Sequence, residues 1–290
     1  MRPGEGPAVE HVVKLDGPVT DFHISGQHIH CMCGKQLLKA DKDQGEIFYR
    51  KEVFAKRGFS RKLAAEGGEI FVYDFCTLSV FRQEDYALQK SWKLGNDLSS
   101  DICGMAVDEN TVYCSIRNGK LVALDWRSGA EKEFPVLGSS MWSLVRYGEG
   151  LVCGSVDGKL LLLDKKTMSI EKRMDLGRKN IGSLYRDGET LYAASHDGRL
   201  FRINMRSWEI EALVKNAHKK MFGCVGMYQD MLVTVSHPCS EVALWDKNTL
   251  EKRGMLTVPL QLSGRARIEG GFLYLSSRNI MGIDKIRLSQ

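Results

Sequence analysis

The chain has 290 residues, 43% of them hydrophobic, which is ample for a packed core. Charged residues make up 27% and the formal net charge is only +5, which argues against disorder and does not demand a nucleic-acid partner. We expect no secretory signal and no membrane span, because no apolar run approaches roughly 18 residues. The eight cysteines are scattered, mostly in apolar runs, which favours a reduced intracellular protein, cytoplasmic or nuclear.

A phrase of about eight residues recurs along the chain. Its clearest copies are Asn118-Gly-Lys-Leu-Val-Ala-Leu-Asp125, Asp157-Gly-Lys-Leu-Leu-Leu-Leu-Asp164 and Asp197-Gly-Arg-Leu-Phe-Arg-Ile-Asn204. In chain order, the seven copies end at Asp41, Arg82, Asp125, Asp164, Asn204, Asp246 and Asp284, 38 to 43 residues apart. The copy that ends at Arg82 is degraded, since it has lost both the turn glycine and the closing aspartate. Units of about 40 residues are typical of four-stranded propeller blades.

The fourth unit shows how one repeat divides into strands. Residues Ser143–Tyr147 and Leu151–Ser155 form two strand-like runs around the turn at 148–150. Asp157-Gly158 predicts a type I′ hairpin turn, with positive φ at both positions. Leu160–Leu163 is continuously apolar, as expected for a strand buried on both faces, and Ile170–Met174 alternates as an exposed outer strand.

The sequence therefore predicts an all-β fold, a single seven-bladed β-propeller of four-stranded antiparallel blades. The seventh unit has room for three strands, and Val12–Leu15 has no partner of its own, so this N-terminal strand is predicted to close the last blade. An open solenoid of hairpins is the alternative, although the chain shows no capping repeats. The predicted blades of this one domain, residues 1–290, are approximately 21–55, 59–95, 101–137, 141–177, 181–217, 222–258 and 263–288, with 11–15 completing the last.

The chain resembles the WD40-repeat proteins. The sixth unit has His218 near its start and Val242-Ala-Leu-Trp245-Asp246 closing its third strand, and Cys153-Gly-Ser-Val-Asp-Gly158 is similar to the turn of that family. The resemblance implies a propeller that serves as a binding platform. Only the sixth unit has the Trp-Asp pair and most units lack the starting histidine, so the family's usual His-to-Asp hydrogen-bond network is expected to be mostly missing. The quinoprotein-like propellers are a neighbouring family with similar phrasing and the same architecture.

No pattern of catalytic residues is present. The sequence has no Gly-x-Ser-x-Gly, no Gly-x-x-x-x-Gly-Lys and no His-Glu-x-x-His, so we expect neither an enzyme nor a cofactor. One local cluster, His28, His30, Cys31 and Cys33, raises the question of a metal site. Strand alternation separates the two histidines from the two cysteines, which favours an inner strand with buried cysteines and partly exposed histidines, and no metal.

Candidate binding residues lie in the loops before the innermost strands. Four of the seven loops carry two or more basic residues, interspersed with apolar ones, and the hairpins between second and third strands are predicted on the same rim. Guanidinium groups grip carboxylate or phosphate, and apolar side chains can anchor a peptide. The predicted partner-binding residues are Arg57, Phe59, Arg61, Arg117, Trp142, Arg178, Lys179, Lys220, Phe222, Arg265, Arg267 and Arg278.

The sequence thus predicts a non-catalytic scaffold or adaptor, a subunit of a complex, that binds an acidic or phosphorylated protein segment on a basic rim. One alternative is a quinoprotein-like propeller enzyme or a ligand-binding sensor. A second is a subunit of an RNA or other nucleic-acid assembly, for which affinity would fall steeply with salt.

Overall fold

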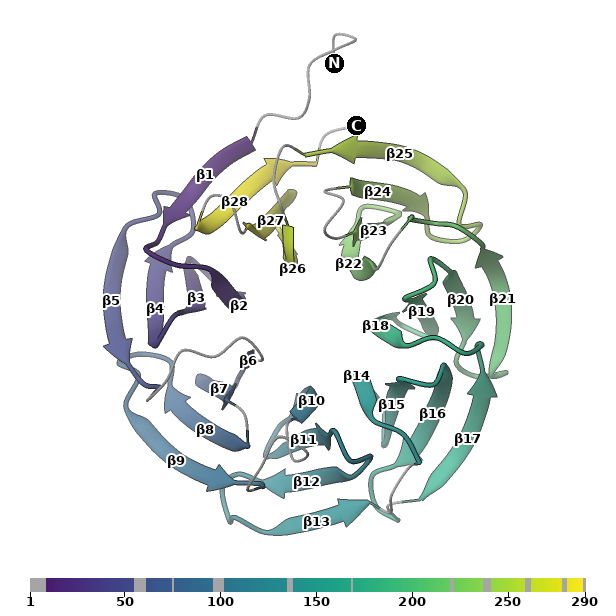
Figure 1. Ribbon diagram of the computed structural model, residues 1–290, viewed down its shortest axis with the longest axis horizontal. Helices are drawn as coiled ribbons and strands as arrows, with labels where there is room; N and C mark the ends of the chain where they lie inside the picture. Colours follow the sequence, from purple (N-terminus) through teal and green to yellow (C-terminus); the bar gives the residue numbers. More distant parts are fainter. Residues whose placement is uncertain are drawn as a thin grey trace, which may run out of the picture. The chain divides into compact units, whose positions relative to one another are not determined.

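The computed structural model describes residues 9–54, 61–74, 76–95, 102–134, 138–167, 169–219, 222–236, 241–258, 262–277 and 281–288. Within these ranges, twenty-eight strands form seven four-stranded sheets, and no helix is present (Figure 1). The fold class is a seven-bladed β-propeller with antiparallel blades, which confirms the prediction from the repeats. No helix in the described part of the chain could span a membrane.

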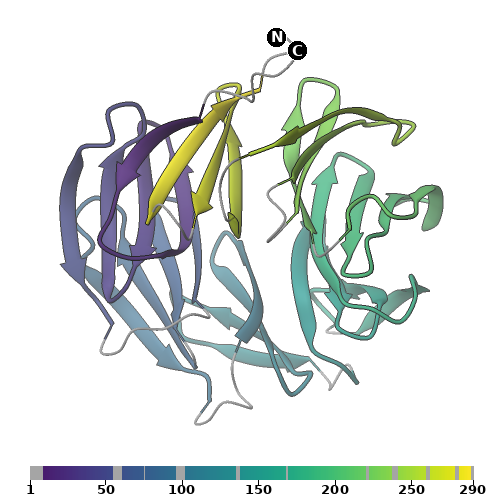
Figure 2. The same ribbon diagram turned by 45° about the horizontal axis from the view of Figure 1, so that its top comes forward.

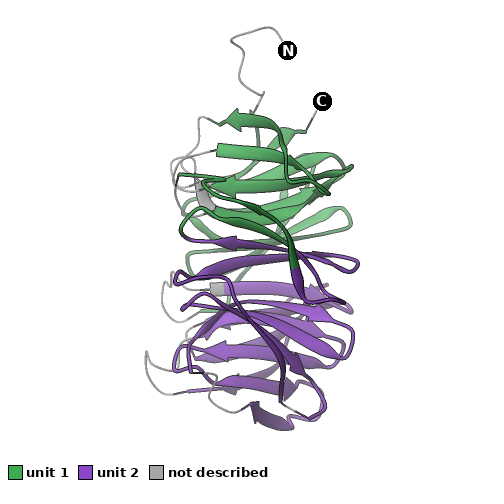
Figure 3. Ribbon diagram, turned by 90° about the vertical axis from the view of Figure 1, so that its right-hand side faces the viewer, with its two compact units in different colours: residues 1–57, 197–202, 210–290 green, residues 58–196, 203–209 purple. Residues whose placement is uncertain are grey.

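The chain divides into two compact units (Figure 3). Unit 1 comprises residues 1–57, 197–202 and 210–290, and unit 2 comprises 58–196 and 203–209, so the fifth blade contributes strands to both. Blade 1 contains β2 (Val19–Ser25), β3 (His28–Cys33), β4 (Gln36–Asp41) and β5 (Ile47–Glu52). Blade 6 contains β22 (Phe222–Tyr228), β23 (Met231–Ser236), β24 (Glu241–Asp246) and β25 (Lys252–Thr257). Blade 7 contains β26 (Leu262–Glu269), β27 (Phe272–Ser277), β28 (Gly282–Arg287) and the N-terminal β1 (Val9–Lys14).

The remaining blades follow the same order of strands. Blade 2 contains β6 (Arg61–Glu66), β7 (Glu69–Asp74), β8 (Thr77–Arg82) and β9 (Leu88–Lys93). Blade 3 contains β10 (Ile102–Asp108), β11 (Thr111–Ile116), β12 (Leu121–Asp125) and β13 (Glu131–Phe134). Blade 4 contains β14 (Met141–Tyr147), β15 (Gly150–Ser155), β16 (Lys159–Asp164) and β17 (Ile170–Asp175). Blade 5 contains β18 (Ile181–Asp187), β19 (Thr190–Ser195), β20 (Leu200–Asn204) and β21 (Glu209–Val214).

The N-terminal strand β1 completes blade 7, as the sequence predicted. It pairs antiparallel with β28, from Val9 opposite Ile286 to Lys14 opposite Gly282, and Figure 2 shows the two strands side by side. The buried Asp284 carboxylate accepts a 2.5 Å hydrogen bond from the Nδ1 atom of His11 across this pair. A side chain at Gly45 would overlap the main-chain oxygen of Val12, so the first blade leaves room for β1 to pass.

The hydrophobic core consists of layers between neighbouring blades. In unit 1, Phe22 and Ile29 of blade 1 pack in one cluster with Tyr274 and Ile283 of blade 7. In unit 2, one cluster joins blades 2 and 3, and another joins blades 3 and 4. The apolar run Leu160–Leu163 is buried throughout, as expected for a third strand covered on both faces.

The recurring closing aspartate caps the turn into the outer strand. The Oδ1 atom of Asp164 accepts hydrogen bonds from the main-chain nitrogens of Lys166 at 2.8 Å and Thr167 at 2.5 Å. Equivalent pairs of bonds reach Asp41, Asp125, Asn204 and Asp246. These bonds explain why a short side chain with an acceptor oxygen recurs at this place.

Two units depart from that pattern. In blade 2, the Arg82 guanidinium pairs with Asp85 at 2.8 Å, and the blade still has four strands. The assignment of Asp284 as the closing residue of the seventh phrase is wrong, because Asp284 lies inside β28. Arg287, opposite the first residue of β27, holds the equivalent position. The outer strand of this blade is β1, which pairs with β28.

The turns between second and third strands also differ from the prediction. Only the glycine of the Asp157-Gly158 turn has positive φ, +87°, and its nitrogen donates to the Ser155 carbonyl. This is a type I turn followed by a left-handed glycine, not a type I′ turn. A side chain at Gly158 would overlap the main chain at Gly177, which leads into the next blade. The glycine therefore serves both the turn and the close approach of that segment.

Candidate functional site

A continuous surface forms in unit 2 where the loops before two innermost strands meet the hairpins between second and third strands. The Ser140 hydroxyl donates to the Arg117 carbonyl, and the Val156 nitrogen donates to the Ser140 carbonyl at 3.0 Å. Gly158 packs on the segment that holds Arg178. These contacts bring together segments of blades 3, 4 and 5. We refer to Arg117, Trp142, Val156, Arg178 and Lys179 as the Trp142 surface.

The Trp142 surface combines exposed apolar and basic side chains. Trp142 is 38% exposed and Val156 is 40% exposed, while Arg117, Arg178 and Lys179 are exposed as well. Aromatic and arginine side chains are enriched at protein interfaces. All of these residues except Val156 were predicted from the sequence. Only the contact between Val156 and Ser140, sixteen residues apart, reveals its place.

The carboxylates near the Trp142 surface already have partners. Asp157 pairs with Lys159 at 2.6 Å, and Asp175 accepts a 2.8 Å hydrogen bond from the nitrogen of Gly177. Arg178 and Lys179 make no ion pair with any residue that the structure describes. Their positive charge therefore remains available to an acidic partner.

Three of the other predicted binding residues lie elsewhere. Phe222 is only 2% exposed and packs on the ring of His218, with centroids 4.8 Å apart, so it cannot act as an exposed anchor. Arg265 and Arg267 flank the buried Asp21 carboxylate at 3.5 and 3.3 Å, where they balance a charge inside unit 1. Arg57, Phe59, Lys220 and Arg278 lie outside the described residues, as does the side chain of Arg61.

Blade 6 contains a buried hydrogen-bond network that starts from His218. The Nε1 atom of Trp245 donates to the Thr234 hydroxyl at 2.8 Å, and that hydroxyl lies 2.8 Å from Nε2 of His218. Since indole can only donate, the hydroxyl donates onward to His218, whose Nδ1 then donates to Glu241 at 3.2 Å. Burial lowers the pKa of His218 despite the opposing effect of Glu241, in agreement with a neutral ring. The network links the second and third strands to the loop before the first.

The histidine and cysteine cluster of β3 lies mostly in the core. Cys31 and Cys33 are buried, as predicted, but His30 is fully buried rather than partly exposed, because β3 is covered by its neighbours on both sides. Burial lowers the pKa of His30 to about 3. Among the described residues, no three His, Cys, Asp or Glu side chains come together as a metal site.

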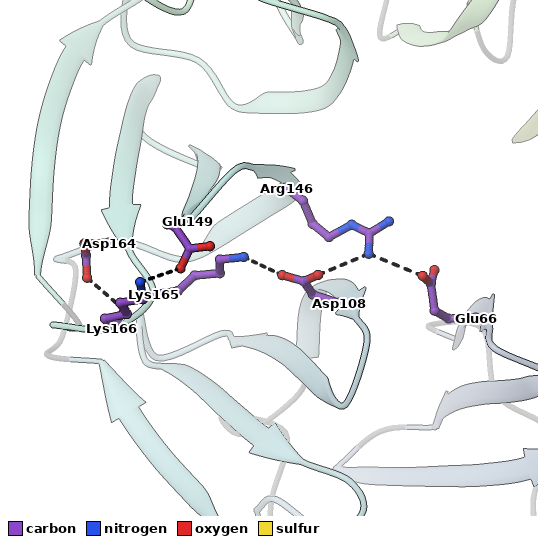
Figure 4. Close-up of polar contacts among 7 residues, drawn as sticks. All are labelled: Glu66, Asp108, Arg146, Glu149, Asp164, Lys165 and Lys166. Atoms are coloured by element: carbon purple, nitrogen blue, oxygen red, sulfur yellow. Dashed lines mark hydrogen bonds and ion pairs between the residues drawn. The ribbon is translucent and has the colours of Figure 1, made fainter.

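A chain of ion pairs connects three successive blades of unit 2 (Figure 4). Arg146 at the end of β14 lies 3.3 Å from Asp108 at the end of β10 and 3.5 Å from Glu66 at the end of β6. The other oxygen of Asp108 accepts a 2.5 Å bond from Lys165. No pattern in the sequence indicates these ion pairs, since their members belong to different repeats.

Comparisons with known proteins bear on the fold alone. No protein-family model matches the chain, and no curated protein matches it. Among solved structures, U3-55K is similar with a TM-score of 0.83 and 12% identity, over 98% of this chain and 100% of that one. The computationally designed protein Ika8 is similar with a TM-score of 0.72 and 11% identity, over 96% and 99% of the two chains.

Proposed function

We propose that the protein is a non-catalytic scaffold, a WD40-like propeller that binds an acidic or phosphorylated segment of a partner protein on the Trp142 surface. The observation that carries the proposal is the exposed pair Trp142 and Val156, bordered by the exposed Arg178 and Lys179, which form no ion pair with a described residue. An aromatic anchor among guanidinium and ammonium groups is the usual composition of a binding hot spot for such a segment.

Further support comes from the thiols and the buried histidine. Burial raises the pKa of Cys114 and Cys224 to about 12, so these thiols stay protonated and are poor nucleophiles. The described cysteines are all free, which suits the reducing interior of the cell that we propose as the site of action. The network of His218, Thr234 and Trp245 lies in the interior of blade 6, where it serves stability, and it supports the WD40-like assignment.

The experiment is a comparison of partners recovered with the wild-type protein and with a variant that combines Trp142→Ala, Arg178→Glu and Lys179→Glu. We expect proteins that copurify with the wild type at constant stoichiometry to be lost from the variant. The proposal is wrong if the same proteins are retained at the same level while circular dichroism shows the variant to be folded.

A matched control carries the same kinds of substitution on exposed outer strands: Leu88→Ala, Lys132→Glu and Arg173→Glu. It changes the net charge equally and should retain every partner. Treatment with nuclease identifies nucleic acid as the bound species, since a partner held through nucleic acid is released when that nucleic acid is digested. Loss of the partners under nuclease would contradict the proposal.

A further inference from the structure

A cavity of about 450 Å³ opens at the other end of β14 from Trp142. Its wall contains the Tyr147-Gly148-Glu149-Gly150 turn, Leu162 and Asp164 of β16, Glu171 of β17, and Arg186 and Glu189 beside the first turn of blade 5. Both blades contribute from within unit 2. The volume falls within the range of about 300 to 1,000 Å³ that is usual for ligand sites. We refer to this feature as the Tyr147 cavity.

Part of the wall is apolar and fixed in place. The Tyr147 hydroxyl donates to Glu189 at 2.7 Å, and the Arg186 guanidinium lies 5.8 Å from the centre of the Tyr147 ring. Leu162 is buried beneath the turn, where a side chain at Gly150 would approach its Cδ1 atom to 2.7 Å. The glycine thus leaves room for Leu162 to pack against the turn. An aliphatic chain could lie between the ring and the turn.

The polar part of the wall is mostly acidic. The cavity is lined by four carboxylates and one guanidinium. Hydrogen bonding from Tyr147 lowers the pKa of Glu189, and main-chain hydrogen bonds from Thr167 lower that of Asp164, so both stay ionised at neutral pH. Glu149 forms an ion pair with Lys166 at 3.0 Å (Figure 4), whereas Glu171 forms no ion pair with a described residue.

We infer that the Tyr147 cavity binds an arginine or lysine side chain of a basic segment of a partner protein. The aliphatic stem of such a side chain would lie along Tyr147 and Leu162, and its cationic end would meet Glu149 and Glu171. The surface is distinct from the Trp142 surface and prefers the opposite charge. The scaffold would then hold two partners of opposite charge at the two ends of the innermost strand of blade 4.

The test is an NMR titration of the folded protein with three synthetic peptides, acetyl-Gly-Gly-X-Gly-Gly-amide, in which X is arginine, lysine or citrulline. We expect the two cationic peptides to shift resonances of Tyr147 and Gly148 and the neutral citrulline peptide to bind at least about tenfold more weakly. Equal binding of the citrulline peptide, or no shift with any of them, would overturn the inference.

Variants locate the site. Glu149→Gln combined with Glu171→Gln should weaken the arginine peptide about tenfold, whereas Glu131→Gln on the exposed outer strand β13 should leave its affinity unchanged. Equal losses in the two would overturn the assignment to this cavity. The outcome is independent of the Trp142 surface, whose triple variant should bind the arginine peptide normally.

Discussion

Removal of one hydroxyl group, by Thr234→Val, tests whether the network in blade 6 stabilises the fold. The side chain is fully buried, and valine keeps its shape. Its Oγ1 atom lies 2.8 Å from both the Trp245 nitrogen and the His218 Nε2 atom. The substitution therefore leaves two buried polar atoms without partners. An unsatisfied buried group costs about 1 to 3 kcal/mol, so the loss of partners for two such groups should lower the free energy of unfolding by about 2 to 6 kcal/mol.

The assay is urea unfolding at pH 7.5, where His218 is neutral, followed by tryptophan fluorescence and by circular dichroism. Thr190→Val is the matched control, since Thr190 opens strand β19 and its hydroxyl makes no hydrogen bond with a described residue. Its effect should stay within about 0.5 kcal/mol. The stability losses from Trp245→Phe and Thr234→Val should be less than additive in the double variant, because both substitutions remove the same hydrogen bond. A Thr234→Val variant as stable as the control would refute the role assigned to the network.

Three further predictions concern buried charge, a turn and the ion-pair chain. The pKa of His30 is about 3 in the folded protein and ordinarily near 6.5, so its contribution to stability is fully present above pH 6.5 and is lost as the pH falls. At pH 4.5 the free energy of unfolding should be lower by about 2 to 3 kcal/mol. Urea unfolding of His30→Gln should lack that part of the pH dependence. Gly158→Ala should lower the free energy of unfolding by about 2 to 4 kcal/mol, because its side chain would overlap the segment that leads into the next blade. Gly188→Ala is the control: Gly188 has φ +57° and open space around it, so the loss should be only about 1 to 2 kcal/mol. Equal losses in the two variants would contradict the close approach of the next blade. Arg146→Met should lower the free energy of unfolding by at most about 1 kcal/mol at low salt and by less in 1 M salt, since the side chain is 42% exposed. A loss of stability that does not change with salt would contradict a screened ion pair.

Much of the fold follows from the sequence because each blade is a local unit. The turn glycines and closing aspartates recur for reasons that lie within a few residues, namely a left-handed φ and capped turn nitrogens. The N-terminal closing strand was predictable by counting strands, since the seventh unit lacked one. The type of the Asp157-Gly158 turn was not predictable, because the same dipeptide suits both a type I′ turn and a type I turn followed by a left-handed glycine.

The candidate site was less predictable because side-chain partners come from different repeats. A loop containing Phe222 does not reveal that its ring packs on His218, nor does the charge of Arg265 and Arg267 reveal the buried Asp21 beneath them. Arg146 and Glu66 are 80 residues apart in the chain, and no local pattern links them. Basic residues in the loops therefore indicated a basic binding rim. Only the structure separates the basic side chains that are exposed to a partner from those that pair with buried carboxylates of the protein itself.

The central claim is that the Trp142 surface binds acidic segments. Selection of a random peptide library against the immobilised wild-type protein tests it most directly, with the Trp142→Ala, Arg178→Glu, Lys179→Glu variant as the comparison. We predict that recovered peptides are enriched in aspartate and glutamate around an apolar residue, and that they bind the wild type but not the variant. Recovered peptides without acidic enrichment, or with equal affinity for the variant, would contradict the claim.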